Sequence, residues 1–330
     1  MLDPDDGPDN GAAMMRSMMR SMISSGLGFL LKAAISVALL VFLLRRVDGA
    51  ALAAQLRQLD AALLLAALLV YLPAILLQAL RLSGVAGMAG GLRFPPALAI
   101  TWIGYAFGQL LPSQIGGDPF RVWYLGKQGI RLRQGFMIVL ADRVLGFIAL
   151  FMLLAAGLPW LFGLTADPLL RGFALALVLA GLAAWQGAVW FDRLAEALLP
   201  KAWLARLPAV PLEAAGFLRQ STGRWRPAIR GFGLSLLAYL AQSLMAWLLA
   251  RALGLDVGLL ALLILMPLTN IAAFLPVSIA GWGLREAVLV PALALLGLPA
   301  ESALVFSILI GLVQLAAALP GLAIWLALRR

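Results

Sequence analysis

The chain contains no cysteine and no histidine among its 330 residues. These absences exclude a disulfide, a thiol nucleophile, an imidazole base and an ordinary zinc site, and we expect neither a metal ion nor a cofactor. Charged residues are also scarce, at 12% of the chain, against about 25% in an average soluble domain. Because much of enzyme chemistry depends on the missing side chains, we expect a protein that is not an enzyme.

Apolar residues dominate the remaining composition. Hydrophobic residues make up 63% of the chain, and the mean hydropathy is +1.00. Several apolar runs approach the ~20 residues that a helix needs to cross the hydrocarbon layer. The composition therefore predicts an all-α polytopic membrane protein with six full spans. These spans are expected at residues 27–44, 61–80, 134–157, 171–190, 229–251 and 301–328.

One motif occurs twice. Residues 112–121 read PSQIGGDPFR and residues 276–285 read PVSIAGWGLR, so both fit the pattern P-x-x-I-[GA]-G-x-x-[FL]-R without a gap. Pro112 and Pro276 follow apolar stretches that they cannot continue as helix, so we interpret them as structural breaks. Broken helices at corresponding places in two halves indicate a binding site near the bilayer midplane.

Each motif joins a longer apolar block to a shorter one. The blocks are 97–111 and 119–128 around the first motif, and 257–275 and 283–297 around the second. Each pair is either a re-entrant hairpin or two complete spans, which would raise the total to ten segments. Both alternatives give each half an odd number of crossings. The sequence therefore predicts an inverted repeat, with units at 27–157 and 171–328 that meet around a pseudo-two-fold axis.

Basic residues next to the spans predict the topology. The segments before the first span, on both sides of the first motif and between residues 191 and 230 are rich in arginine and lysine, which predicts that both termini are cytoplasmic. Arg45, Arg46 and Arg57 oppose this orientation. We expect residues 1–26 to be a disordered cytoplasmic tail and residues 191–228 to be an amphipathic cytoplasmic loop. The net charge of +10 then indicates anionic lipid headgroups as partners, not nucleic acid.

The motif glycines are candidate site residues because they allow a tight turn with free N–H groups. Gly116 and Gly117 occupy the first turn, and Gly281 and Gly283 occupy the second. A helix that starts there can bind phosphate. The simpler alternative is two kinks that only shape the bundle.

Arg121 and Arg285 end the two motifs, each nine residues after its proline. An arginine inside a membrane faces a cavity or a partner. We therefore predict that the two guanidinium groups clamp one phosphate, the alternative being that both side chains extend to the interface. Asp118 and Glu286 are expected to compensate charge within each hairpin.

Asp142 and Arg143 lie inside the expected span 134–157. Adjacent residues on a helix point about 100° apart, so each needs a separate partner. We expect them to contact the hairpins across the cavity, the alternative being a network that only stabilises the fold.

Polar side chains also mark the helices before the two motifs. Thr101, Tyr105 and Gln109 repeat every four residues, and Asn270 occupies the analogous place before the second motif. They line a transport pathway or join helices by hydrogen bonds.

The motif pair followed by Asp142-Arg143 resembles the lysylphosphatidylglycerol synthase transmembrane-region family, also called flippase-like membrane proteins. The resemblance covers about residues 27–328. It is carried by Pro112, Gly116, Gly117, Asp118, Arg121, Asp142, Arg143, Pro276, Gly281, Gly283, Arg285 and Glu286.

In bifunctional members of that family this region moves an aminoacylated phospholipid between leaflets, and a soluble domain makes the lipid. Stand-alone relatives are linked to other envelope lipids, including glycosylated polyprenyl carriers and hopanoids. The resemblance implies a stand-alone lipid transporter of the plasma membrane that moves an anionic or phosphate-bearing lipid. A membrane-embedded lipid-carrier transferase and an accessory subunit of an envelope-lipid pathway remain alternatives, and a homo-oligomer is left open.

Overall fold

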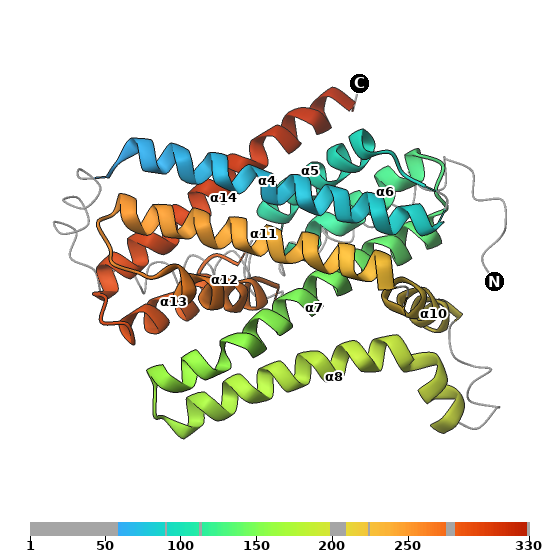
Figure 1. Cartoon of the computed structure of the whole chain (residues 1–330). Coiled ribbons are helices and arrows are strands. Elements are labelled where there is room, and N and C mark those ends of the chain that lie inside the picture. Colours follow the sequence, from blue (N-terminus) through green and yellow to red (C-terminus); the bar gives the residue numbers. More distant parts are fainter. Residues whose placement is uncertain are drawn as a thin grey trace, which may run out of the picture.

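The computed structural model describes residues 59–89, 91–111, 114–198, 209–223, 225–274 and 281–328. Within these ranges the chain forms ten α-helices, two short 3-10 helices and no β-strand (Figure 1). The prediction of an all-α polytopic membrane protein is confirmed.

Five of the described helices are long and apolar enough to cross a membrane. Each contains one of the spans expected from the sequence. They are α4 (Ala61–Ala86), α7 (Leu132–Leu164), α8 (Pro168–Leu198), α11 (Trp225–Ala252) and α14 (Ala300–Leu328). The sixth expected span, 27–44, and the tail 1–26 lie outside the described residues.

The two motifs lie between pairs of shorter helices. The first pair is α5 (Phe94–Leu110) with α6 (Asp118–Lys127), and the second is α12 (Leu259–Phe274) with α13 (Leu284–Ala294). The longer arms have 17 and 16 residues and the shorter arms 10 and 11, or ~25 Å and ~15 Å at 1.5 Å per residue. Because the hydrocarbon layer is about 30 Å thick, these lengths favour re-entrant hairpins over complete spans. Pro112 and Pro276 lie outside the described residues.

Local sequence explains where α4 and α13 begin. Asp60 caps α4 by accepting hydrogen bonds from the backbone N–H groups of Ala62 (2.9 Å) and Leu63 (3.2 Å). The turn before α13 places Gly281 and Gly283 at φ +81° and +87°, a backbone region that residues with a Cβ rarely adopt. The predicted need for glycine in the second motif therefore has a direct conformational cause.

Helices α4 and α11 run antiparallel along each other (Figure 1). At one end the N–H of Asp60 donates to the carbonyl oxygen of Ala252 (3.2 Å). Nearer the other end, Arg81 donates to Ser235 Oγ (2.7 Å). These two helices contain the second expected span of each proposed unit. Their antiparallel packing therefore agrees with inverted halves.

Further helix contacts occur at corresponding places in the two proposed units. Helix α5 packs on α14, and its counterpart α12 packs on α7. Likewise α6 packs on α7 and α13 packs on α14. This pairing is what an inverted repeat predicts. The boundaries 27–157 and 171–328 stay a prediction, because the first expected span of the first unit lies outside the described residues.

Helix α8 lies at the edge of the bundle against α7 and α10 (Ala209–Gly223). It exposes Leu169 and Phe173, as a helix that faces lipid would. Within the predicted amphipathic cytoplasmic loop 191–228, α8 continues through Phe191 and Leu194 to its end at Leu198, and α10 follows at Ala209–Gly223. Residues 199–208 lie outside the described residues.

The apolar core of the bundle has two large clusters and a small third cluster between α7, α8 and α12. One large cluster joins α4 and α11 to α12, α13 and α14, and the other joins α4 to α5, α6 and α7. Along α4, Ile75 belongs to the first cluster and Leu82 to the second. The polar residues Gln78 and Arg81 lie between them in the sequence, which positions polar side chains where the two clusters meet.

The second motif offers a direct stability test. We expect Gly281→Ala to lower the free energy of unfolding by about 1–2 kcal/mol or more, because of the positive φ. The added Cβ would also lie 2.9 Å from Ala273 Cα. Thermal unfolding in detergent would measure the loss. Gly172→Ala on α8 is the control, since no atom lies within 4 Å of its added Cβ. Equal stability of both variants would contradict this explanation.

Candidate functional site

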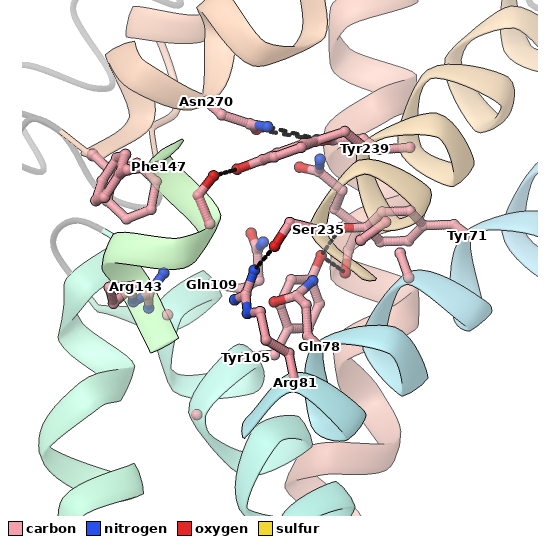
Figure 2. Close-up of a pocket in the computed structure, with 18 of the residues that line it drawn as sticks. Tyr71, Gln78, Arg81, Tyr105, Gln109, Arg143, Phe147, Ser235, Tyr239 and Asn270 are labelled. Carbon is pink, nitrogen blue, oxygen red and sulfur yellow. Dashed lines mark hydrogen bonds between the residues drawn. The ribbon is translucent and has the colours of Figure 1, made fainter. Parts of the chain in front are cut away.

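A cavity of about 100 Å³ lies between α4, α5, α7, α11 and α12, with further lining residues from α6 and α14 (Figure 2). One water needs about 10–15 Å³, so this central cavity can hold water or a small polar group. Three arginines line it: Arg81, Arg121 and Arg143. The other polar side chains of the lining are Tyr71, Gln78, Tyr105, Gln109, Ser235, Tyr239, Gln242, Asn270 and Gln314.

A buried ion pair joins α4 to α7 beside this cavity. Arg81 donates to Asp142 from Nε (2.7 Å to Oδ1) and from Nη2 (3.1 Å to Oδ2). Its third nitrogen, Nη1, donates to Ser235 Oγ (2.7 Å) on α11. Asp142 is 1% exposed and Arg81 is 7% exposed. Each of the three nitrogens of the Arg81 guanidinium group thus has a partner on α7 or α11, which uses three of its five N–H groups.

Arg121 is the least completely partnered cation of the cavity. It is 3% exposed, yet its Nη1 lies 3.5 Å from Asp142 Oδ2 and 3.9 Å from Asp118 Oδ1. Its Nε is buried and has no hydrogen-bond partner among the described residues. A buried guanidinium with an unused donor is costly, so it favours a ligand that supplies an acceptor.

Arg143 pairs with the first motif. It donates to Asp118 from Nε (3.0 Å to Oδ2) and from Nη2 (2.8 Å to Oδ1), a bidentate arrangement. Its guanidinium also lies over the ring of Phe274, 5.2 Å from the centroid. Asp142 and Arg143 therefore both contact the hairpin arm α6, as one of the two sequence hypotheses expects. The same contacts stabilise the fold, so the two hypotheses are not exclusive.

The charges of this group do not cancel. We call Arg81, Asp118, Arg121, Asp142 and Arg143 the central charge cluster, which has three cations and two anions and thus one surplus positive charge. All three arginines line the cavity, whereas neither aspartate is among its lining residues. The described surface of the cavity is therefore cationic.

The second motif forms a separate and neutral group. Arg285 donates to Glu286 Oε1 from Nη2 (2.8 Å), and the N–H of Gly283 donates to Glu286 Oε2 (2.6 Å). Ser307 also donates to Glu286 Oε1 (2.9 Å). The predicted compensation of Arg285 by Glu286 agrees with this geometry.

Arg285 does not lie on the central cavity beside Arg121, so the described structure lacks the predicted two-arginine clamp. The physical reason is the adjacent Glu286, which holds the guanidinium inside its own hairpin. Its remaining nitrogen, Nη1, lies 3.4 Å from Gln314 Oε1, and Gln314 lines the cavity. Arg285 thus reaches the cavity only through Gln314.

Neutral hydrogen bonds complete the cavity wall. The hydroxyl groups of Tyr71 and Tyr105 are 2.9 Å apart, and the side-chain amides of Gln242 and Asn270 exchange two hydrogen bonds of 3.1 and 2.8 Å. Gln109 also lines the cavity. The predicted polar positions Tyr105, Gln109 and Asn270 therefore meet at one place, and two of them also join helices.

Glycines on facing helices make room for the arginines. A Cβ on Gly104 would collide with the side chain of Arg121, and a Cβ on Gly311 would collide with that of Arg285. Gly117 approaches the backbone carbonyl of Gly104 too closely to carry any side chain. Gly116 is also closely packed, since an added Cβ would lie 2.6 Å from Leu111 Cβ. The first-motif glycines thus allow the turn between α5 and α6 to pack closely against α5.

Arg81 is a lining residue of the cavity that was not among the candidates predicted from the sequence. It follows an expected span and counts among the basic residues of a loop, but α4 continues to Ala86 and buries it. A signal was present, since Tyr71, Gln78 and Arg81 recur at spacings of seven and three residues, typical of one helix face. The helix then ends in the 3-10 turn Gly87–Ala89.

Fold and site together define a polytopic helical membrane protein with a cation-lined cavity between two helical hairpins. The chain belongs to the family described as the lysylphosphatidylglycerol synthase TM region, which it matches over residues 29–321. The resemblance stated from the motifs is thereby confirmed, and membership places the chain among integral membrane proteins involved in lipid handling. No curated protein matches it.

The buried pair of Arg81 and Asp142 can be tested by a double-mutant cycle. We expect Asp142→Asn to destabilise the protein by about 3–5 kcal/mol, because it leaves a buried guanidinium without its carboxylate. In the Asp142→Asn background, Arg81→Gln should lower the free energy of unfolding much less than it does in the wild-type protein. Thermal unfolding in detergent measures all four proteins.

The matched control for this cycle is the pair of Arg133 and Glu213, whose side chains are 47% and 48% exposed. An exposed pair contributes about 1 kcal/mol or less. Coupling of equal size in the two cycles would show that burial of Asp142 is not the source of its effect.

Proposed function

We propose that this protein moves an anionic or phosphate-bearing envelope lipid between the leaflets of the plasma membrane. The observation that carries the proposal is the lining of the central cavity, which presents three arginines and, among the described residues, no carboxylate. One positive charge of the cluster is not neutralised. A phosphate group is the lipid component that such a surface would attract.

Arg121 is the proposed primary phosphate ligand. Its contacts to Asp142 (3.5 Å) and Asp118 (3.9 Å) are long, so a phosphate oxygen can compete for the same N–H groups. Arg81 and Arg143 are held in place by short ion pairs and would add charge. The acyl or isoprenoid tails would remain in the bilayer.

The repeated architecture supports movement through the membrane. Inverted halves with broken helices at the midplane are typical of transporters that expose one site alternately to both sides. We further propose that both termini are cytoplasmic, since the basic segments favour this orientation.

A membrane-embedded transferase is the rival function. It needs a general base within reach of its substrate. Asp118 and Asp142 are each bound to an arginine, and Glu286 is bound by Arg285, Ser307 and the N–H of Gly283. None of the three is among the lining residues of the central cavity, which favours transport. An accessory subunit would have no lipid affinity of its own, and binding experiments separate that alternative.

We expect Arg121→Gln to reduce lipid transport at least about tenfold, because a charge-assisted hydrogen bond to phosphate contributes ~1.5–3 kcal/mol. The measurement is the scrambling of fluorescent phosphatidylglycerol by the purified protein in liposomes. Arg93→Gln, which removes an exposed charge before α5, is the control. Transport at the wild-type rate by Arg121→Gln would exclude Arg121 as the ligand.

Native mass spectrometry gives an independent test and identifies the lipid. We expect a phosphorylated lipid to copurify with the wild-type protein and to be lost from the Arg121→Gln variant. Equal retention by both proteins would place the lipid site elsewhere, and no retained lipid together with no transport would favour the accessory alternative.

A further inference from the structure

A second cavity, of about 240 Å³, lies beside the central cavity, between α4, α7, α10 and α11. We call it the outer cavity. Its wall combines apolar side chains with three arginines, Arg81, Arg226 and Arg230. The apolar part includes Met88 and Leu145. This combination suits a molecule with a charged head and an apolar tail.

The two outer arginines are available for a ligand. Arg226 and Arg230 lie four residues apart in the first turns of α11, so they share one helix face. Both are exposed, and neither forms an ion pair with a described residue. The start of α11 adds a partial positive charge from its N–H groups. Together these features favour a phosphate group.

Arg81 connects the two cavities, because it lines both of them. Helix α11 follows the same path, since Gly231 lines the outer cavity and Ser235, one turn further on, lines the central one. The Arg81 guanidinium group bonds to Ser235 at this boundary (2.7 Å; Figure 2). A phosphate group bound by Arg226 and Arg230 would therefore meet Arg81 next.

We propose that the outer cavity is a docking site for the headgroup of an anionic phospholipid, from which Arg81 leads the phosphate to Arg121. This inference rests on the proposed transport function and adds the route by which the substrate reaches the central cavity. It assigns Arg226 and Arg230 to substrate capture and the apolar wall to the first part of the lipid tails.

Gly84 provides a probe inside the outer cavity. It lines this cavity, and no atom lies within 4 Å of a Cβ added there, so Gly84→Cys fits without displacing a neighbour. The natural chain has no cysteine, so this thiol is the only one in the variant. The rate of its alkylation by a maleimide in detergent therefore reports occupancy of the outer cavity.

We expect dioctanoyl phosphatidylglycerol to slow this alkylation by about tenfold, since an occupied site excludes the reagent. Dioctanoyl phosphatidylcholine and inorganic phosphate should have little effect. In the Gly84→Cys background, Arg226→Gln with Arg230→Gln should abolish the protection. Arg93→Gln with Arg131→Gln removes the same charge from exposed positions outside the cavity and should keep it.

Three results would overturn the proposal: no protection by phosphatidylglycerol, protection that survives loss of Arg226 and Arg230, or equal protection by inorganic phosphate. The last would indicate a phosphate site without lipid selectivity. Adding Arg121→Gln should leave the protection intact. In protein that keeps Arg121, protection without any transport would contradict the transport function but keep the docking site, whereas transport without protection would do the reverse.

Discussion

The site depends on the ion pairs that the carboxylate of Asp142 forms with two arginines. From α7 it binds Arg81 on α4 and Arg121 on α6, and Arg81 in turn binds Ser235 on α11. A carboxylate that is 1% exposed is tolerated in a membrane protein only when such partners replace its water. One side chain thus holds three helices and the first hairpin together, and it places two of the three arginines on the cavity wall.

The two motifs are alike in sequence but differ in charge. After Arg285 comes Glu286, which binds it and also accepts from Gly283 and from Ser307 on α14, so the charges of the second hairpin cancel. After Arg121 comes Val122, and the nearest carboxylates belong to Asp142 and to Asp118, which is bound mainly to Arg143. The first hairpin therefore contributes the surplus charge, while the second hairpin contributes the uncharged side chains of Asn270 and Phe274 to the cavity wall.

The sequence predicted the helices and the breaks well, because long apolar runs and Pro-Gly motifs act locally. It also predicted that Asp142 and Arg143 need separate partners. It did not predict Arg81, because a basic residue at the end of an apolar run looks like a loop residue until the length of α4 is known. The clamp of Arg121 with Arg285 was also not found, because pattern similarity does not reveal that Glu286 takes up one of the two cations.

Incomplete pairing of Arg121 is what the proposed transport site requires. Fully paired cations would not attract a phosphate, and wholly unpaired ones would be too costly to bury. With contacts of 3.5 and 3.9 Å to its two carboxylates and an unused Nε, Arg121 lies between these extremes. In the proposed function a phosphate would replace the weak contacts when it binds, and the same carboxylates would compete for the guanidinium when it leaves. Binding would then stay weak enough for release, a condition that applies to any protein through which a substrate must pass.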